Sequence, residues 1–140
     1  MSHSRVGVCV LLAFSVASVA IATEWHVPGN FDEIQQAISA TYVVDGDTIS
    51  VWGNGTPPFP PYDAINYLQK GLYIVNSSYL GETPGYPPSW DYVIIDGRNQ
   101  GTTVTMTSIH SGTTARLEGF TIVNGTGMNY HAAGVHVSGG

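Results

Sequence analysis

The feature that most constrains the fold is a short β pattern that recurs along the chain. It is found in "YIVNSS" at 73 to 78, in "YVIIDGRNQG" at 92 to 101 and in "FTIVNGTG" at 120 to 127. In each stretch an isoleucine stands two residues before an Asn or Asp, so a unit of 20 to 28 residues repeats. A period of this length is typical of solenoids, in which each coil buries its apolar face against the coils above and below it.

Further short runs from Gly46 onward support the same interpretation. They include "DTISVWG", "TVTMT" and "GVHVS", separated by turn residues. Within the runs the alternation places one set of side chains on a single face: Ile49 and Val51, Val104 and Met106, Phe120 and Ile122, Val135 and Val137. The chain is therefore predicted to be an all-β solenoid, a right-handed parallel β-helix.

The polar residue at the end of each run is predicted to form a ladder. If the isoleucines stack inside the solenoid, then Asn76, Asp96 and Asn124 share their inward parity. Buried amides and carboxylates need partners, which they can find on one another and on the turn backbone. Gly97 and Gly125 are expected to supply left-handed backbone beside them. The alternative is that these residues only form turns, and both interpretations are structural.

One helix is expected, over residues 30 to 40. Its apolar face consists of Phe31, Ile34, Ala37 and Ile38. Asn30 and Glu33 have the spacing of a capping box at the beginning of the helix. Because the helix follows the short extended "EWHV" and precedes a series of strands, residues 23 to 45 are predicted to be a strand and helix that cap the solenoid.

The first 22 residues have the pattern of a secretory signal peptide. Arg5 precedes an apolar run that ends in small residues, with a cleavage site before Thr23. The alternative is a membrane anchor, for which the run is short. Cys9, the only cysteine, lies in this segment, so the mature chain is expected to have no disulfide. Removal of the segment is expected to leave no membrane span. The expected location is extracellular or on the bacterial outer surface.

Charge narrows the range of partners. The formal net charge is -6, and the only basic residues beyond the leader are Lys70, Arg98 and Arg116. Nucleic acid is therefore excluded as the expected partner. Extracellular polysaccharide and cell-surface components are the partner classes that remain.

Four stretches carry a resemblance to a known family. They are "EWHVPGNFDEIQQAI", "GDTISVWGNGT", "VIIDGRNQGTTVTM" and "ARLEGFTIVNG". With them the chain resembles exported bacterial right-handed β-helix repeat proteins, which are related in fold to pectate lyases. The resemblance implies the fold, but its members range from sugar-active enzymes to large surface proteins. It also implies that residues 46 to 140 are the first coils of a longer solenoid, so that the chain is an N-terminal fragment.

Two proline-rich loops, at 54 to 67 and 77 to 90, carry aromatic residues. Aromatic rings beside a long β surface can stack on sugars, and the glycan-contact candidates are Phe59, Tyr62, Tyr67, Tyr79, Tyr86 and Trp90. The alternative is that these rings fold back and pack on the flank of the solenoid.

Candidates for catalysis are few. The carboxylates considered are Asp45, Asp47, Asp96 and Glu118, and the histidines His110, His131 and His136 have no metal-ligand spacing. No cofactor is expected, and calcium enters only if the protein is a lyase. The sequence therefore favours a structural, adhesive or glycan-contacting surface protein over the alternative, a polysaccharide lyase or glycoside hydrolase with its site in later coils.

Overall fold

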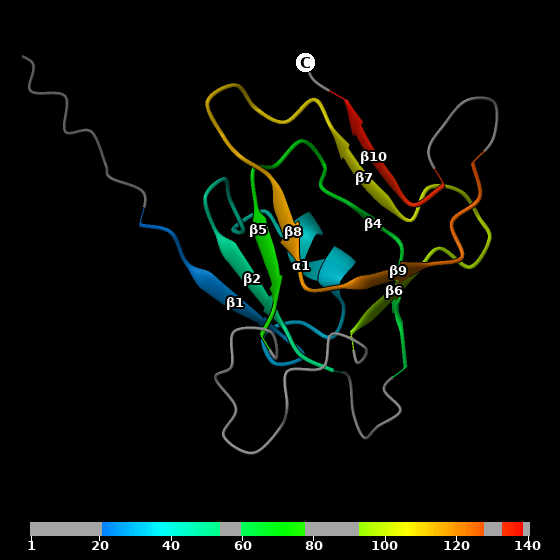
Figure 1. Cartoon of the computed structure of the whole chain (residues 1–140). Coiled ribbons are helices and arrows are strands. Elements are labelled where there is room, and N and C mark those ends of the chain that lie inside the picture. Colours follow the sequence, from blue (N-terminus) through cyan, green and yellow to red (C-terminus); the bar gives the residue numbers. More distant parts are fainter. Residues whose placement is uncertain (1–20, 54–59, 78–92, 128–132, 139–140) are drawn as a thin grey trace, which may run out of the picture.

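The computed structural model of the chain describes residues 21–53, 60–77, 93–127 and 133–138 (Figure 1). The first elements are β1 (Glu24–Val27) and α1 (Ile34–Ser39), and three coils of three short strands follow. The first coil has β2 (Thr48–Val51), β3 (Tyr62–Asp63) and β4 (Ile65–Asn66); the second has β5 (Tyr73–Asn76), β6 (Ile94–Asp96) and β7 (Val104–Thr107). The third has β8 (Arg116–Glu118), β9 (Thr121–Val123) and β10 (Val135–Ser138).

Corresponding strands of successive coils form three parallel sheets. Sheet A has the order β1-β2-β5-β8, sheet B the order β3-β6-β9, and sheet C the order β10-β7-β4. Every strand pair is parallel. This confirms the prediction of an all-β solenoid of the parallel β-helix type with one short helix near its N-terminus.

The interior consists of apolar side chains stacked from coil to coil. In sheet A, Ile49 pairs with Ile74, which pairs with Leu117. In sheet B, Tyr62 pairs with Ile95, which pairs with Ile122. The first two members of each stack are at most 1% exposed, whereas Leu117 and Ile122 in the third coil are partly exposed. Burial therefore decreases along the solenoid axis.

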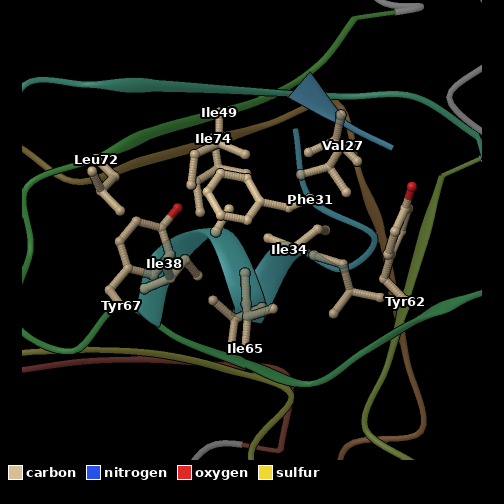
Figure 2. Close-up of a cluster of buried hydrophobic side chains, with 14 of the residues drawn as sticks. Val27, Phe31, Ile34, Ile38, Ile49, Tyr62, Ile65, Tyr67, Leu72 and Ile74 are labelled. Carbon is tan, nitrogen blue, oxygen red and sulfur yellow. The ribbon is translucent and has the colours of Figure 1, made fainter. Parts of the chain in front are cut away.

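Helix α1 closes the N-terminal end of this interior. Its side chains Ile34, Ala37 and Ile38 are fully buried. Figure 2 shows Ile34 and Ile38 among side chains contributed by all three sheets. The predicted apolar face is thus the buried face. Among the described residues no helix is long and apolar enough to cross a membrane.

The predicted capping box is wrong. The helix begins at Ile34, its N-cap residue is Glu33, and the Glu33 side chain makes no capping bond. Asn30 instead accepts a bond from the His26 amide at 2.9 Å, which closes the turn between β1 and the helix. Gln36 reaches back to the Asp32 amide at 3.0 Å. The amide of Gln36 thus takes the part that the sequence pattern assigned to Glu33.

The predicted ladder of Asn76, Asp96 and Asn124 is also wrong. Asn76 lies in sheet A and the other two lie along sheet B, where Asp96 pairs with Val123 and Asn124 follows one residue later. The fully buried Asn76 donates instead to the Gly119 carbonyl of the next coil at 2.8 Å. The prediction failed because strands of different sheets end in the same local pattern. A polar residue followed by a turn therefore does not show to which sheet the strand belongs.

The recurrent glycines are explained by close backbone approach. A Cβ atom at Gly97 would lie 2.8 Å from the Asn124 carbonyl oxygen, and one at Gly125 would lie 1.6 Å from that of Ala133. The left-handed backbone belongs to Asn124 itself, at φ 52. Gly97 is therefore needed where the second coil touches the third, and Gly125 is needed where the segment before β10 returns to the end of β9.

Candidate functional site

A shallow polar pocket lies where sheet B turns toward sheet C. Its volume is about 310 Å³, and it is lined by Asp63, Ala64, Asp96, Gly97, Arg98, Gln100 and Thr102. The lining comes from the first and second coils. Of the residues considered in the sequence, the structure brings Asp96 and Arg98 together here.

The two carboxylates of the pocket are neighbours across parallel strands. Asp63 on β3 pairs with Asp96 on β6. The preceding residues, Tyr62 and Ile95, point into the core, so alternation turns both carboxylates outward. Adjacent strands lie about 4.8 Å apart, which brings like charges close together. This arrangement needs a cation or a hydrogen-bond donor nearby.

Arg98 supplies that cation from a tight turn. Arg98 and Asn99 both have left-handed backbone, at φ 48 and φ 58. The turn is held by the Arg98 amide, which donates to Asp96 Oδ1 at 2.7 Å, and by the Gln100 amide, which donates to Gly97 O at 2.9 Å. The guanidinium group of Arg98 then pairs with the Asp63 carboxylate of the preceding coil. Both side chains of that pair are more than half exposed, so the pair adds little stability.

A third carboxylate affects the electrostatics of the pocket. Partial desolvation raises the pKa of Glu33, and the negative charge of Asp63 raises it further, while Arg98 lowers it. Glu33 is therefore within electrostatic reach of the pocket. The pocket presents hydrogen-bond acceptors in excess over donors, a combination suited to a ligand rich in hydroxyl groups.

The Asp-Gly-Asp turn has a structural role. The carboxylate of Asp47 is 1% exposed and accepts three bonds: from Thr23 N at 2.8 Å, Trp25 Nε1 at 2.9 Å and Val44 N at 3.0 Å. Burial opposes its charge, but these donors outweigh burial and lower the pKa of Asp47. Asp47 thus connects β1, the segment after α1 and the first coil.

Asp45 joins the three coils at one corner. Its Oδ1 accepts a bond from the Gly71 amide of the second coil at 2.8 Å. Its Oδ2 lies 2.7 Å from Nδ1 of His110, which precedes the third coil. Burial opposes the charge of Asp45, but the bonds from His110 and Gly71 outweigh it and lower the pKa.

Lys70 closes the C-terminal end of α1. Its ammonium group donates to the carbonyls of Ile38, Ala40 and Val43 at 2.6, 2.8 and 2.8 Å. Desolvation lowers the pKa of Lys70, although the nearby carboxylates of Asp45 and Asp47 oppose the shift. All three ammonium protons have acceptors, so Lys70 is a capping residue of the helix.

The remaining candidates are placed apart from the pocket. Glu118 lies on β8, where it accepts bonds from the Tyr73 hydroxyl at 2.9 Å and from Arg116 at 3.0 Å. His136 lies on β10 opposite Thr105. His131 is outside the described residues. Within the described ranges, no group of three or more His, Cys, Asp or Glu side chains is arranged to hold a metal ion.

The glycan-contact prediction must be corrected at Tyr62 and Tyr67. The two rings are 1% and 0% exposed, and their hydroxyls donate to the carbonyls of Trp52 and Arg116 at 2.7 Å. Burial raises the pKa of both hydroxyls above the ordinary range. These rings fill the core, so neither offers a face to a sugar. The other four candidates, Phe59, Tyr79, Tyr86 and Trp90, lie outside the described residues.

Asp63 is the pocket residue that the sequence interpretation missed. It lies in "PPYDAINY", which was assigned to a loop, yet this segment contains both β3 and β4. The alternation of Tyr62, Asp63 and Ile65 is too short to stand out directly after two prolines. The signal that could have revealed the strands is the pair Tyr62 and Ile65, which are buried on either side of the exposed Asp63 and Ala64.

Comparison of the chain with protein-family models, with curated protein sequences and with solved structures finds no match. The fold and the pocket therefore define the class. The chain is a parallel β-solenoid, closed by a helix at its N-terminal end, with a polar pocket on its flank.

Proposed function

We propose that this chain is a structural part of an exported surface protein, the capped start of a β-helix scaffold that meets glycans or neighbouring cells. The observation that carries the proposal is a regular apolar stack that begins behind a closed N-terminal end. Helix α1 fills that end, and Ile49, Ile74 and Leu117 stack in successive coils behind it. Stacked coils behind a capping helix have the design of a scaffold module.

The flank pocket supports a glycan contact within this role. It is shallow, open and lined by carboxylates, an arginine and an amide, which can bond to sugar hydroxyls without deep burial. This site replaces the buried tyrosines as the candidate contact.

Export is part of the same proposal. It rests on Arg5, the apolar run after it and the small residues before Thr23. When the chain is produced in a secreting bacterial host, N-terminal sequencing of the exported material should begin at Thr23. Recovery of the chain in the membrane fraction with Met1 retained would contradict removal of a leader.

A second candidate function is favoured by one observation, the alignment of Asp63 and Asp96 beside Arg98. Paired carboxylates are the groups that glycoside hydrolases use, and carboxylates with an arginine suit a lyase. Against it, Asp96 already accepts a bond from the turn and Asp63 is paired with the guanidinium group.

Incubation with pectin, alginate and other uronic-acid polymers, with and without calcium, distinguishes the two functions. The scaffold proposal predicts that polymer length stays unchanged. Steady release of unsaturated oligosaccharides, abolished by a chelator, would overturn it in favour of a lyase. The variants Asp63→Asn and Asp96→Asn would then show whether that cleavage occurs in this pocket.

A further inference from the structure

The end of the solenoid at α1 has sheet edges as well as an apolar interior. In the described part of the chain, β1 and β4 are end strands of sheets A and C, and both contact α1. The helix fills the interior, but it uses its own backbone N–H and C=O groups internally and cannot extend a sheet. An unpaired strand edge accepts any extended chain that reaches it. The edges of β1 and β4 therefore need a separate means of closure.

The backbone of β4 shows which groups face its outer edge. The Ile65 amide donates to the Thr103 carbonyl at 2.9 Å. The Tyr67 amide donates to the Thr105 carbonyl, on β7, at 3.0 Å. In a parallel ladder the N–H and C=O of one residue point to the same side, and those of the next residue point to the other side. The N–H and C=O of Asn66 therefore face away from β7, toward the outer edge of sheet C.

Both outward groups of Asn66 are occupied by one side chain of α1. Gln35 Oε1 accepts a bond from Asn66 N at 2.6 Å, and Gln35 Nε2 donates to Asn66 O at 3.2 Å. Nε2 also donates to Ser39 Oγ at 3.2 Å, one turn along the helix, which orients the amide. Figure 2 shows Ile65, the neighbour of Asn66 on β4, beside this helix. Because a side-chain amide has the donor and acceptor of a peptide group, Gln35 makes the pair of bonds that a neighbouring strand would make.

The edge of β1 is closed in a similar way. The Val27 carbonyl accepts a bond from the Trp52 amide, beside β2, at 2.7 Å, so the preceding residue, His26, turns its backbone groups outward. The His26 amide donates to Asn30 Oδ1 at 2.9 Å, and its carbonyl accepts from the Asn30 amide at 2.9 Å. Two residues of one short segment thus close the edges of two sheets.

We infer that Gln35 and Asn30 act as strand substitutes, which occupy the edges of β4 and β1 and keep strands of other chains, a second copy included, from pairing there. The contact is autoinhibitory, because it engages the groups through which a strand would be added. The inference goes beyond the proposed scaffold role and does not depend on it, since any sheet with a bare edge is open to strand addition.

Amide hydrogen exchange in Gln35→Ala tests the inference at the edge itself. Alanine removes both bonds to Asn66, favours the helix and introduces no large apolar side chain. The Asn66 amide should exchange about tenfold faster than in the unaltered chain, because it loses its acceptor. The amides of Ile65 and Tyr67 should keep their protection, because they bond on the β7 side.

Association is the second measurement on the same variant. At equal concentration, sedimentation velocity should show larger species for Gln35→Ala than for the unaltered chain. The Asn66 amide should regain protection as the concentration rises, because a strand of a second copy pairs with the freed edge. Gln36→Ala is the matched control: it removes an amide from the same helix, but that amide bonds to Asp32 N at 3.0 Å. It should neither free Asn66 nor increase association.

Asn30→Ala repeats the test on β1. The His26 amide should exchange faster, because it loses its side-chain acceptor, and the Asn66 amide should keep its protection. Faster exchange at both positions would mean that the segment closes the end as one unit, and it would overturn the separate roles assigned to the two amides.

Unchanged exchange of the Asn66 amide in Gln35→Ala would overturn the inference. A freed Asn66 amide without greater association than in Gln36→Ala would overturn it too, because the edge would then need no guard. Loss of protection at Ile65 and Tyr67 in Gln35→Ala would show that this side chain holds the fold itself, which also contradicts a role confined to the edge.

Discussion

Replacing Asp47 with alanine is expected to lower the free energy of unfolding by about 3 kcal/mol, because the loss leaves three partly buried donors without their acceptor. The carboxylate accepts from Thr23, Trp25 and Val44, and these donors connect β1 and the segment after α1 to the first coil. Urea unfolding followed by tryptophan fluorescence measures the change. Asp63→Ala, which removes a 62% exposed carboxylate, is the control and should change stability by less than about 1 kcal/mol.

The Asp47 carboxylate is also expected to make the stability of the fold decrease at acidic pH. The pKa of Asp47 in the folded chain is lowered from 3.8, so the group contributes stability that is fully present above its unfolded pKa. This contribution is lost as the pH falls through the folded pKa. Asp45, whose pKa is also lowered, adds in the same direction. The free energy of unfolding, measured from neutral to strongly acidic pH, should fall less steeply for Asp47→Asn than for the unaltered chain. The same pH dependence in both proteins would contradict the role assigned to Asp47.

Truncating Ile74 to alanine is expected to cost about 2 to 5 kcal/mol, because the cavity lies between two coils and cannot collapse. Ile74 is fully buried between Ile49 and Leu117. Val44→Ala is the matched control: Val44 is 45% exposed, so its loss should cost less than about 1 kcal/mol. A loss below 1 kcal/mol at Ile74 would show that the coils do not share this stack.

The repeating β runs were predictable because side-chain alternation is a local property. The stretches around Thr48–Val51 and Val104–Thr107 alternate clearly, Tyr73–Asn76 carries the repeated isoleucine and asparagine, and each forms a strand. The buried face of α1 follows from the spacing of its apolar residues for the same reason. Pattern and burial agree at Val104–Thr107 and at α1, whereas Ser50 and Val75, which alternation places on the outward side of their strands, are also buried.

The assignment of strands to sheets was not predictable from the same pattern. "LEGFTIVNG" reads as one run, but a bend at Gly119, with φ 81, divides it between β8 in sheet A and β9 in sheet B. The coils differ in length, so the sequence has no fixed period that would align equivalent positions. For example, Tyr73 pairs with Thr48, 25 positions earlier, and with Arg116, 43 positions later.

The pocket could be predicted only in part. Asp96 and Arg98 stand out beside a turn, but their partner Asp63 is distant in sequence and lies on a strand of two residues. Long-range pairs such as Asp45 with His110 depend on which corners of the solenoid stack. Such contacts depend on the register between coils. The residue pattern of a single strand does not determine that register, so it does not predict these contacts.

Backbone nuclear Overhauser effects in the labelled chain test the central claim, the parallel stacking of three coils, most directly. The account predicts contacts between α-protons and amide protons that link Ile49 to Ile74 and Ile74 to Leu117, with a separate series linking Tyr62, Ile95 and Ile122. Close pairs of α-protons between these strands, which mark antiparallel neighbours, would contradict the account, as would a series joining Ile74 directly to Ile94 and Ile122.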